Sequence, residues 1–115
     1  MEHTMKLRSE PFEKIRAGQK TVEMRLYDEK RQQIRIGDQI TFQCEEESLT
    51  AQVRALHRFP SFGALYSAMP KEMLGYGTEE TADPKDMERY YTPEQQKQYG
   101  VLGIEIERIA ICKRK

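Results

Sequence analysis

The sequence contains no tryptophan, only two cysteines and no long apolar segment. Cys44 and Cys112 are far apart and each lies in an apparent strand, which favours two small apolar residues over a disulfide framework. No stretch approaches the ~20 apolar residues that a membrane-spanning helix requires, and the polar start of the chain lacks an apolar secretion signal. We therefore expect a soluble, cytoplasmic protein that does not enter a membrane.

Common nucleotide and metal motifs are missing as well. The chain has neither a GxxxxGK phosphate-binding loop nor a dinucleotide-binding glycine fingerprint, so classical nucleotide hydrolysis and hydride transfer have no support. His3, in a start that we expect to be flexible, and His57 are isolated, and neither cysteine belongs to a CxxC pair. His57 could act as a general base, although a lone histidine at a strand end is more often a structural hydrogen-bonding residue. We predict no metal site and no cofactor.

Charged residues are abundant but balanced. With 115 residues the chain is long enough for one core, and we expect residues 1–115 to form a single domain. The 19 Lys and Arg residues equal the 19 Asp and Glu residues in number, which excludes a protein that coats nucleic acid through a strong overall positive field. Any nucleic-acid contact must use a local patch. The basic candidates are Lys20, Arg25, Lys30 with Arg31 and Arg35, Arg54 with Arg58, and the tail 113–115, which we expect to be frayed.

The order of helix and strand signals predicts an α+β fold. Ser9, followed by an acid and a proline, predicts a helix N-cap, and Gly18 is placed to end this short helix. Alternating apolar residues predict extended segments at 21–26, 34–36, 40–43, 49–55 and 101–111, with a hairpin joining the third and fourth. Further helices are predicted after Ser61, Asp83 and Thr92. A small, curved, mostly antiparallel β-barrel flanked by short helices fits this order.

The stretch from 18 to 25, GQKTVEMR, concentrates ionisable side chains on one predicted strand. A period of two gives this strand an apolar face of Val22, Met24 and Leu26. Its other face carries Thr21, Glu23 and Arg25, with Lys20 at the strand entrance. Glu23 and Arg25 could form a solvated ion pair, typically worth less than ~1 kcal/mol, or the charged row could line a ligand site. We expect Lys20, Glu23 and Arg25 to face one solvent-accessible concavity.

Three tyrosines, Tyr90, Tyr91 and Tyr99, flank the last two predicted helices. Their rings could stack on bases, as in proteins that bind single-stranded nucleic acid. The alternative is that the rings pack in the core and send their hydroxyls to water. Both interpretations remain open at this point.

The chain resembles the ASCH domain family. The resemblance rests on PFEKIRAGQKTVEMRL, DEKRQQIRIGDQITF, SFGAL and YYTPEQQKQYGVLGIEI, in that order, and spans almost the entire sequence. Its most diagnostic part is a GxKxxExR pattern, met by Gly18, Lys20, Glu23 and Arg25. The resemblance implies a PUA-like β-barrel flanked by helices, in which the motif residues line a cleft that binds RNA or a nucleotide.

The first functional hypothesis is therefore an RNA- or nucleotide-binding module. Lys20 and Arg25 would contact phosphate or a base edge, Glu23 would orient Arg25 or accept a hydrogen bond from a base amine, and nearby tyrosines would stack on bases. The predicted ligand-binding residues are Lys20, Thr21, Glu23, Arg25, Lys30, Arg31 and Tyr91.

The alternative is a small hydrolase acting on a modified nucleoside or on RNA phosphodiester bonds. A branch similar to acetylcytidine amidohydrolases has a threonine nucleophile where this sequence has Glu23, and Thr21 is one position out of register for that role. If the protein is a hydrolase, Lys20 and Glu23 would be the catalytic pair, with Lys20 or Arg25 stabilising phosphate charge and Glu23 moving a proton. A protein-interaction domain without a small ligand is the third possibility.

Overall fold

The computed structural model describes the backbone of residues 1–113 and the side chains of residues 1–109, so the side chains of Cys112 and of the tail lie outside the described part. The strands are β1 (Glu2–Lys6), β2 (Val22–Leu26), β3 (Gln39–Cys44), β4 (Glu47–Phe59) and β5 (Val101–Lys113). The helices are α1 (Ser9–Arg16), α2 (Phe62–Ala68) and α3 (Pro93–Tyr99), with 3₁₀ helices η1 (Arg31–Gln33) and η2 (Pro84–Arg89). Within the described residues, no helix has the length and apolar character needed to cross a membrane.

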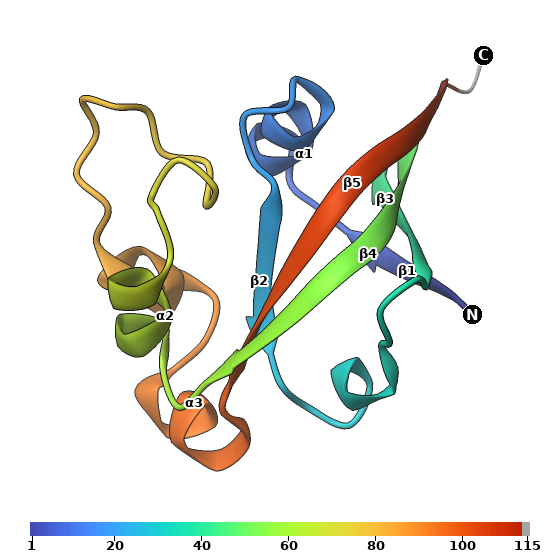
Figure 1. Cartoon of the computed structure of the whole chain (residues 1–115). Helices are drawn as coiled ribbons and strands as arrows, with labels where there is room; N and C mark the ends of the chain where they lie inside the picture. The colour runs from blue at the N-terminus through green and yellow to red at the C-terminus, as the bar shows by residue number, and fades with distance from the viewer. Residues whose placement is uncertain (114–115) are drawn as a thin grey trace.

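The sheet is mixed and curls into a half-barrel. Its strand order is β1-β3-β4-β5-β2, with β1 parallel to β3 and the other neighbouring pairs antiparallel. Figure 1 shows β4 and β5 as two long strands that cross the molecule together, with β2 on one side and β3 and β1 on the other. Register shifts at Thr50/Ala51 and Val53/Ala55 interrupt this long ladder, and such irregularities bend a strand pair. The predicted α+β class with a curved, mostly antiparallel sheet is confirmed.

Local signals placed most element boundaries correctly. Gly18 adopts a φ of 78°, the left-handed conformation expected of a residue that ends α1. The Ser61 hydroxyl accepts a hydrogen bond from the Ala64 amide at 3.1 Å, which caps α2 as predicted. The prediction that Ser9 is the N-cap of α1 is wrong. Ser9 is already the first helical residue, and Arg8 occupies the N-cap without a side-chain hydrogen bond.

The N-terminal segment is the main error of the sequence-based prediction. Residues 2–6 form β1, which pairs in parallel with β3, and Met5 is buried there. His3 is ordered rather than flexible, because its Nε2 lies 2.9 Å from the Asp38 carboxylate. The extended segment predicted at 34–36 is absent, and the Ile36 side chain is 66% exposed. Parallel pairing between distant segments leaves no local signal, so β1 could not be read from its own polar sequence.

Two apolar clusters hold the fold together. The first lies between α1 and the curled sheet and includes Phe12, Ile15, Phe42, Leu49 and Ile104. The second packs β2 against α2 and includes Val22, Met24, Leu26, Phe62 and Leu65. Figure 1 shows α2 and α3 gathered on the β2 side of the sheet, with α1 beyond one end of β2. The predicted apolar face of residues 21–26 is therefore confirmed, and it fixes which side chains β2 turns away from this second cluster.

Candidate ligand-binding cleft

A cleft of about 590 Å³ opens beside β2. Its lining comes from the end of β1 with the start of α1, from β2 with Lys20, and from residues between α2 and Tyr91, just after η2. The cations in this lining are Lys6, Arg8, Lys14, Lys20, Arg25 and Arg89. The tyrosines are Tyr66, Tyr76, Tyr90 and Tyr91. Charge and aromatic surface from distant parts of the sequence thus meet in one concavity.

Glu23 is the centre of a buried ion-pair network in this cleft. Its side chain is 5% exposed, its Oε1 lies 3.0 Å from the Lys20 Nζ, and its Oε2 accepts a hydrogen bond of 2.7 Å from the Arg25 Nε. The Lys20 and Arg25 side chains are themselves only 10% and 13% exposed. The interpretation of Glu23 and Arg25 as a solvated pair is therefore wrong. All three groups line one cleft as expected, but they are mostly withdrawn from water.

The backbone around β2 explains how this network forms. The amides of Thr21 and Val22 both donate to the Met73 carbonyl at 2.9 Å, which ties the strand entrance to the loop after α2. The Lys20 amide donates back to the Lys14 carbonyl at the end of α1. Because alternate residues share a face, Glu23 and Arg25 then lie together on the side of β2 opposite its apolar cluster.

Arg25 also connects the two edge strands of the half-barrel. Its Nη2 donates a hydrogen bond of 3.0 Å to the Lys6 carbonyl at the end of β1, while its Nε is held by Glu23. Since β1 and β2 are the outermost strands in the sheet order, this side chain bridges the open side of the barrel. Arg25 is therefore a structural link as well as a cleft residue.

The charges of the network are fixed by its geometry. Burial alone would raise the pKa of the Glu23 carboxyl, but the Lys20 ammonium and the Arg25 guanidinium outweigh burial and hold this pKa below its ordinary value. Burial opposes the charge of Arg25, yet Glu23 raises the pKa of this guanidinium above its usual range. Glu23 is consequently an anion and Arg25 a cation at neutral pH.

The tyrosines at the cleft differ in how free their rings are. The ring of Tyr91 stacks on Phe62 of the second cluster at a centroid distance of 5.7 Å, and burial raises the pKa of its hydroxyl. Tyr90 is 44% exposed, and the guanidinium groups of Arg8 and Arg89 lie 5.3 and 5.6 Å from its ring centroid. Tyr99 lies outside the described cleft lining. Tyr90 is thus the exposed aromatic surface, and Tyr91 belongs partly to the core.

The cations of the cleft fall into two groups. Lys20 and Arg25 pair with Glu23, and the Lys14 Nζ lies 3.4 Å from Glu10. The ion pairs of the described residues include none with Lys6, Arg8 or Arg89, which also line the cleft. We call these three residues the rim cations. The buried network itself has one carboxylate for two cations, so the rim cations add to a positive charge that Glu23 balances only in part.

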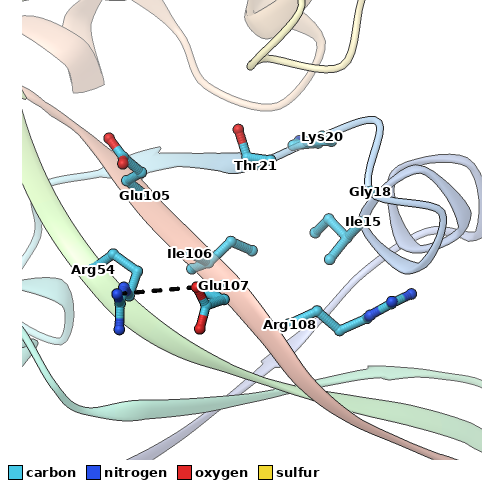
Figure 2. A pocket seen from close by; sticks show the side chains of 9 residues that line it. All are labelled: Ile15, Gly18, Lys20, Thr21, Arg54, Glu105, Ile106, Glu107 and Arg108. Carbon is cyan, nitrogen blue, oxygen red and sulfur yellow. Dashed lines mark ion pairs between the residues drawn. The ribbon is translucent and has the colours of Figure 1, made fainter.

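Thr21 is placed in a neighbouring pocket instead of the cleft. This second pocket, of about 480 Å³, lies next to β5, and Figure 2 shows Thr21 and Lys20 along one side of it, with Glu105 and Ile106 from β5. Among the residues that the structure describes, Lys20 alone lines both cavities. Thr21 precedes the first residue of β2, so the period that places Glu23 and Arg25 together does not extend to it. His57, which contacts Glu105 at 3.1 Å, has the hydrogen-bonding position expected of it.

Lys30 and Arg31 also lie outside the described lining of the cleft. Arg31 is held by Asp28, whose carboxylate accepts from its backbone amide at 3.0 Å and lies 3.3 Å from its Nη1. Lys30 is exposed at the start of η1. The basic pair is therefore a feature of the loop after β2, separate from the ion-pair network.

The sequence analysis did not identify the rim cations, nor two of the cleft tyrosines: Tyr66 in α2 and Tyr76 in the loop that follows α2. They come from the end of β1, from α2, from the following loop and from η2. Their positions depend on how these segments pack around β2, so no spacing in the sequence groups them. The GxKxxExR pattern located only the network that they surround.

Comparison with known proteins identifies the family. No curated protein matches the chain. The sequence of hypothetical protein PH0355 is 34% identical to this chain. Its crystal structure matches with a TM-score of 0.82 over 95% of this chain and 100% of that one. The solution structure of PF0455 from Pyrococcus furiosus is 36% identical, with a TM-score of 0.75 over 95% and 98% of the two chains.

An ASCH protein from Zymomonas mobilis shares the fold, with a TM-score of 0.62 over 96% of this chain and 71% of that one, at 15% identity. The ASCH domain model matches residues 5–110, which include every residue of the cleft. The chain therefore belongs to the ASCH domain family.

Proposed function

We propose that the cleft beside β2 binds RNA or a nucleotide. The observation that supports this proposal is the presence of three rim cations without ion-pair partners among the described residues, around a buried network in which one carboxylate already serves two further cations. The described lining has six cations and four carboxylates (Glu10, Glu23, Glu80 and Asp86), so an anionic ligand would balance a formal excess of two positive charges. The family, which is broadly RNA-binding, supports the same conclusion.

The chemistry of the rim suits phosphate and base together. Arginine presents several N–H donors in a planar fork that matches phosphate oxygens, and lysine adds a mobile point charge. Tyr90 lies between these cations with 44% of its surface exposed, so a base could stack on its ring while the attached phosphate contacts Arg8 or Arg89. Lys6 extends the positive rim on the β1 side.

The geometry of Glu23 favours binding over hydrolysis. A general acid or base needs a pKa near the working pH and a site within reach of the reacting proton. Both carboxylate oxygens of Glu23 already contact cations, and the pKa of this group is held low. Lys20 is engaged in the same network, so the pair expected for a hydrolase instead supports the cleft as a fixed charged scaffold.

Titration of a fluorescent single-stranded RNA at several salt concentrations tests the proposal. Arg8→Ala and Arg89→Ala should each weaken binding about fivefold and lower the slope of log K against log salt by about 0.7, as expected when one phosphate contact is lost. Arg54→Ala is the matched control, because Arg54 is also an exposed arginine but lines the neighbouring pocket. Equal affinities and salt slopes for all four proteins would contradict the assignment of the cleft.

A further inference from the structure

Three side chains on the far wall of the cleft form a hydrogen-bonded chain. The Tyr66 hydroxyl of α2 lies 2.9 Å from the Tyr76 hydroxyl, and the Tyr76 hydroxyl donates to the Asp86 Oδ2 at 2.7 Å. All three residues line the same cleft as the ion-pair network. The hydrogen-bonded chain of Tyr66, Tyr76 and Asp86 is separate from that network, which consists of Lys20, Glu23 and Arg25.

The direction of this chain follows from the number of protons available. A carboxylate is only an acceptor, so the single hydroxyl proton of Tyr76 is committed to Asp86. The Tyr76 oxygen can then only accept from Tyr66, which commits the Tyr66 proton as well. Burial, together with Tyr66 and Asp86, raises the pKa of the Tyr76 hydroxyl, so this proton is retained at neutral pH. The Tyr66 oxygen is left with lone pairs and no proton to offer a ligand.

The loop that carries Tyr76 is fixed by backbone contacts. The Lys71 ammonium donates to the carbonyls of Thr78 and Glu80 at 2.9 and 2.6 Å, which closes the loop behind Tyr76. The rings of Tyr66 and Tyr76 pack edge to face with centroids 5.8 Å apart. The hydrogen-bonded chain is therefore preorganised, and its polarity does not depend on a ligand.

We propose that the Tyr66–Tyr76–Asp86 chain is a specificity device that accepts a hydrogen bond from the exocyclic amine of a nucleobase. This inference rests on the proposed function, because it assigns the class of base that enters the same cleft. The rim cations would hold the phosphate, and the Tyr66 oxygen would select adenine or cytosine over the corresponding oxo-bases. A carbonyl oxygen facing Tyr66 would meet a second acceptor and lose affinity.

The test measures binding of two pairs of nucleoside 5′-monophosphates: AMP with IMP, and CMP with UMP. Within each pair, an exocyclic amine is exchanged for a carbonyl. For at least one pair, the native protein should bind the amino form about three- to tenfold more tightly, the effect expected of one hydrogen bond. Tyr66→Phe removes the acceptor and should abolish this preference. Asp86→Asn should reverse it, because the amide can donate to Tyr76 and so turn the Tyr66 proton toward the ligand.

Tyr99→Phe provides the control, since it removes a hydroxyl from a tyrosine outside the described cleft lining and should leave every ratio unchanged. Thermal unfolding of each variant checks that the fold is retained. If Asp86→Asn does not fold, the loss or persistence of the base preference in Tyr66→Phe alone tests the inference. Equal binding within both nucleotide pairs, or a preference that persists in both variants, would overturn the inference while leaving nucleotide binding in place. Absence of all nucleotide and RNA binding would overturn the proposed function and the inference with it.

Discussion

Replacing Arg25 by alanine should destabilise the fold far more than loss of a surface ion pair would. The change leaves the Glu23 carboxylate, whose side chain is 5% exposed, with Lys20 as its remaining ion-pair partner. Removing one partner of a buried pair typically costs 3–5 kcal/mol. Because Lys20 still neutralises part of the charge, we expect a loss of about 2–3 kcal/mol in the free energy of unfolding.

Urea denaturation measures this loss directly. With an m value of about 1 to 1.5 kcal/mol per M for a protein of this size, the midpoint should fall by about 2 M. Arg54→Ala is the control, since Arg54 forms an exposed pair with Glu107 at 4.0 Å and should cost less than ~1 kcal/mol.

A double-mutant cycle then tests whether the cost comes from Glu23. Arg25→Ala should be less harmful in a Glu23→Gln background, with a coupling of about 1–3 kcal/mol, because a neutral amide does not need the guanidinium. The buried-network interpretation is refuted if Arg25→Ala costs no more than Arg54→Ala. It is also refuted if the effects of Arg25→Ala and Glu23→Gln are additive, because the Glu23 carboxylate is then effectively solvated.

Two further predictions concern the supports of the cleft and of β1. Gly75 has a φ of 101°, and a Cβ there would lie 3.3 Å from the Lys20 Cδ, so Gly75→Ala should lower the free energy of unfolding by about 1–2 kcal/mol in urea titrations. Hydrogen bonds from His3 and from the Arg35 amide lower the pKa of Asp38 from 3.8 to about 2, so its carboxylate stabilises the native state above pH 3.8 and loses this effect as the pH falls toward 2. Asp38→Asn should therefore flatten the dependence of unfolding free energy on pH in that window, and an unchanged acid slope would contradict this role.

The sequence was sufficient wherever the determining interactions are local. The helix stop at Gly18, the cap at Ser61 and the hairpin between β3 and β4 each depend on residues within a few positions of one another. The apolar face of β2 followed from a period of two, and the family resemblance supplied the barrel. The stop, the cap and the hairpin could be predicted because their interactions are local, and the apolar face because the alternation of apolar side chains is itself visible in the sequence.

The remaining features depend on contacts between distant segments. β1 exists because Met5 and its neighbours pair with β3 more than thirty residues later, and its polar sequence gives no sign of this. The burial of Glu23 could not be inferred from its charge, since it requires Lys20 and Arg25 to satisfy both carboxylate oxygens. The Tyr66–Tyr76–Asp86 chain likewise joins α2, a loop and η2.

The position of β2 determines which substitutions can separate function from stability. One face of this short edge strand packs into the second apolar cluster, and the other carries the buried network that also reaches β1 through Arg25. A change at Lys20, Glu23 or Arg25 therefore alters the fold and the cleft together, so loss of binding in such a variant cannot be assigned to ligand contact. The rim cations and the tyrosine chain surround this network without belonging to it. Variants at Arg8, Arg89 and Tyr66 are consequently the ones from which ligand recognition can be read.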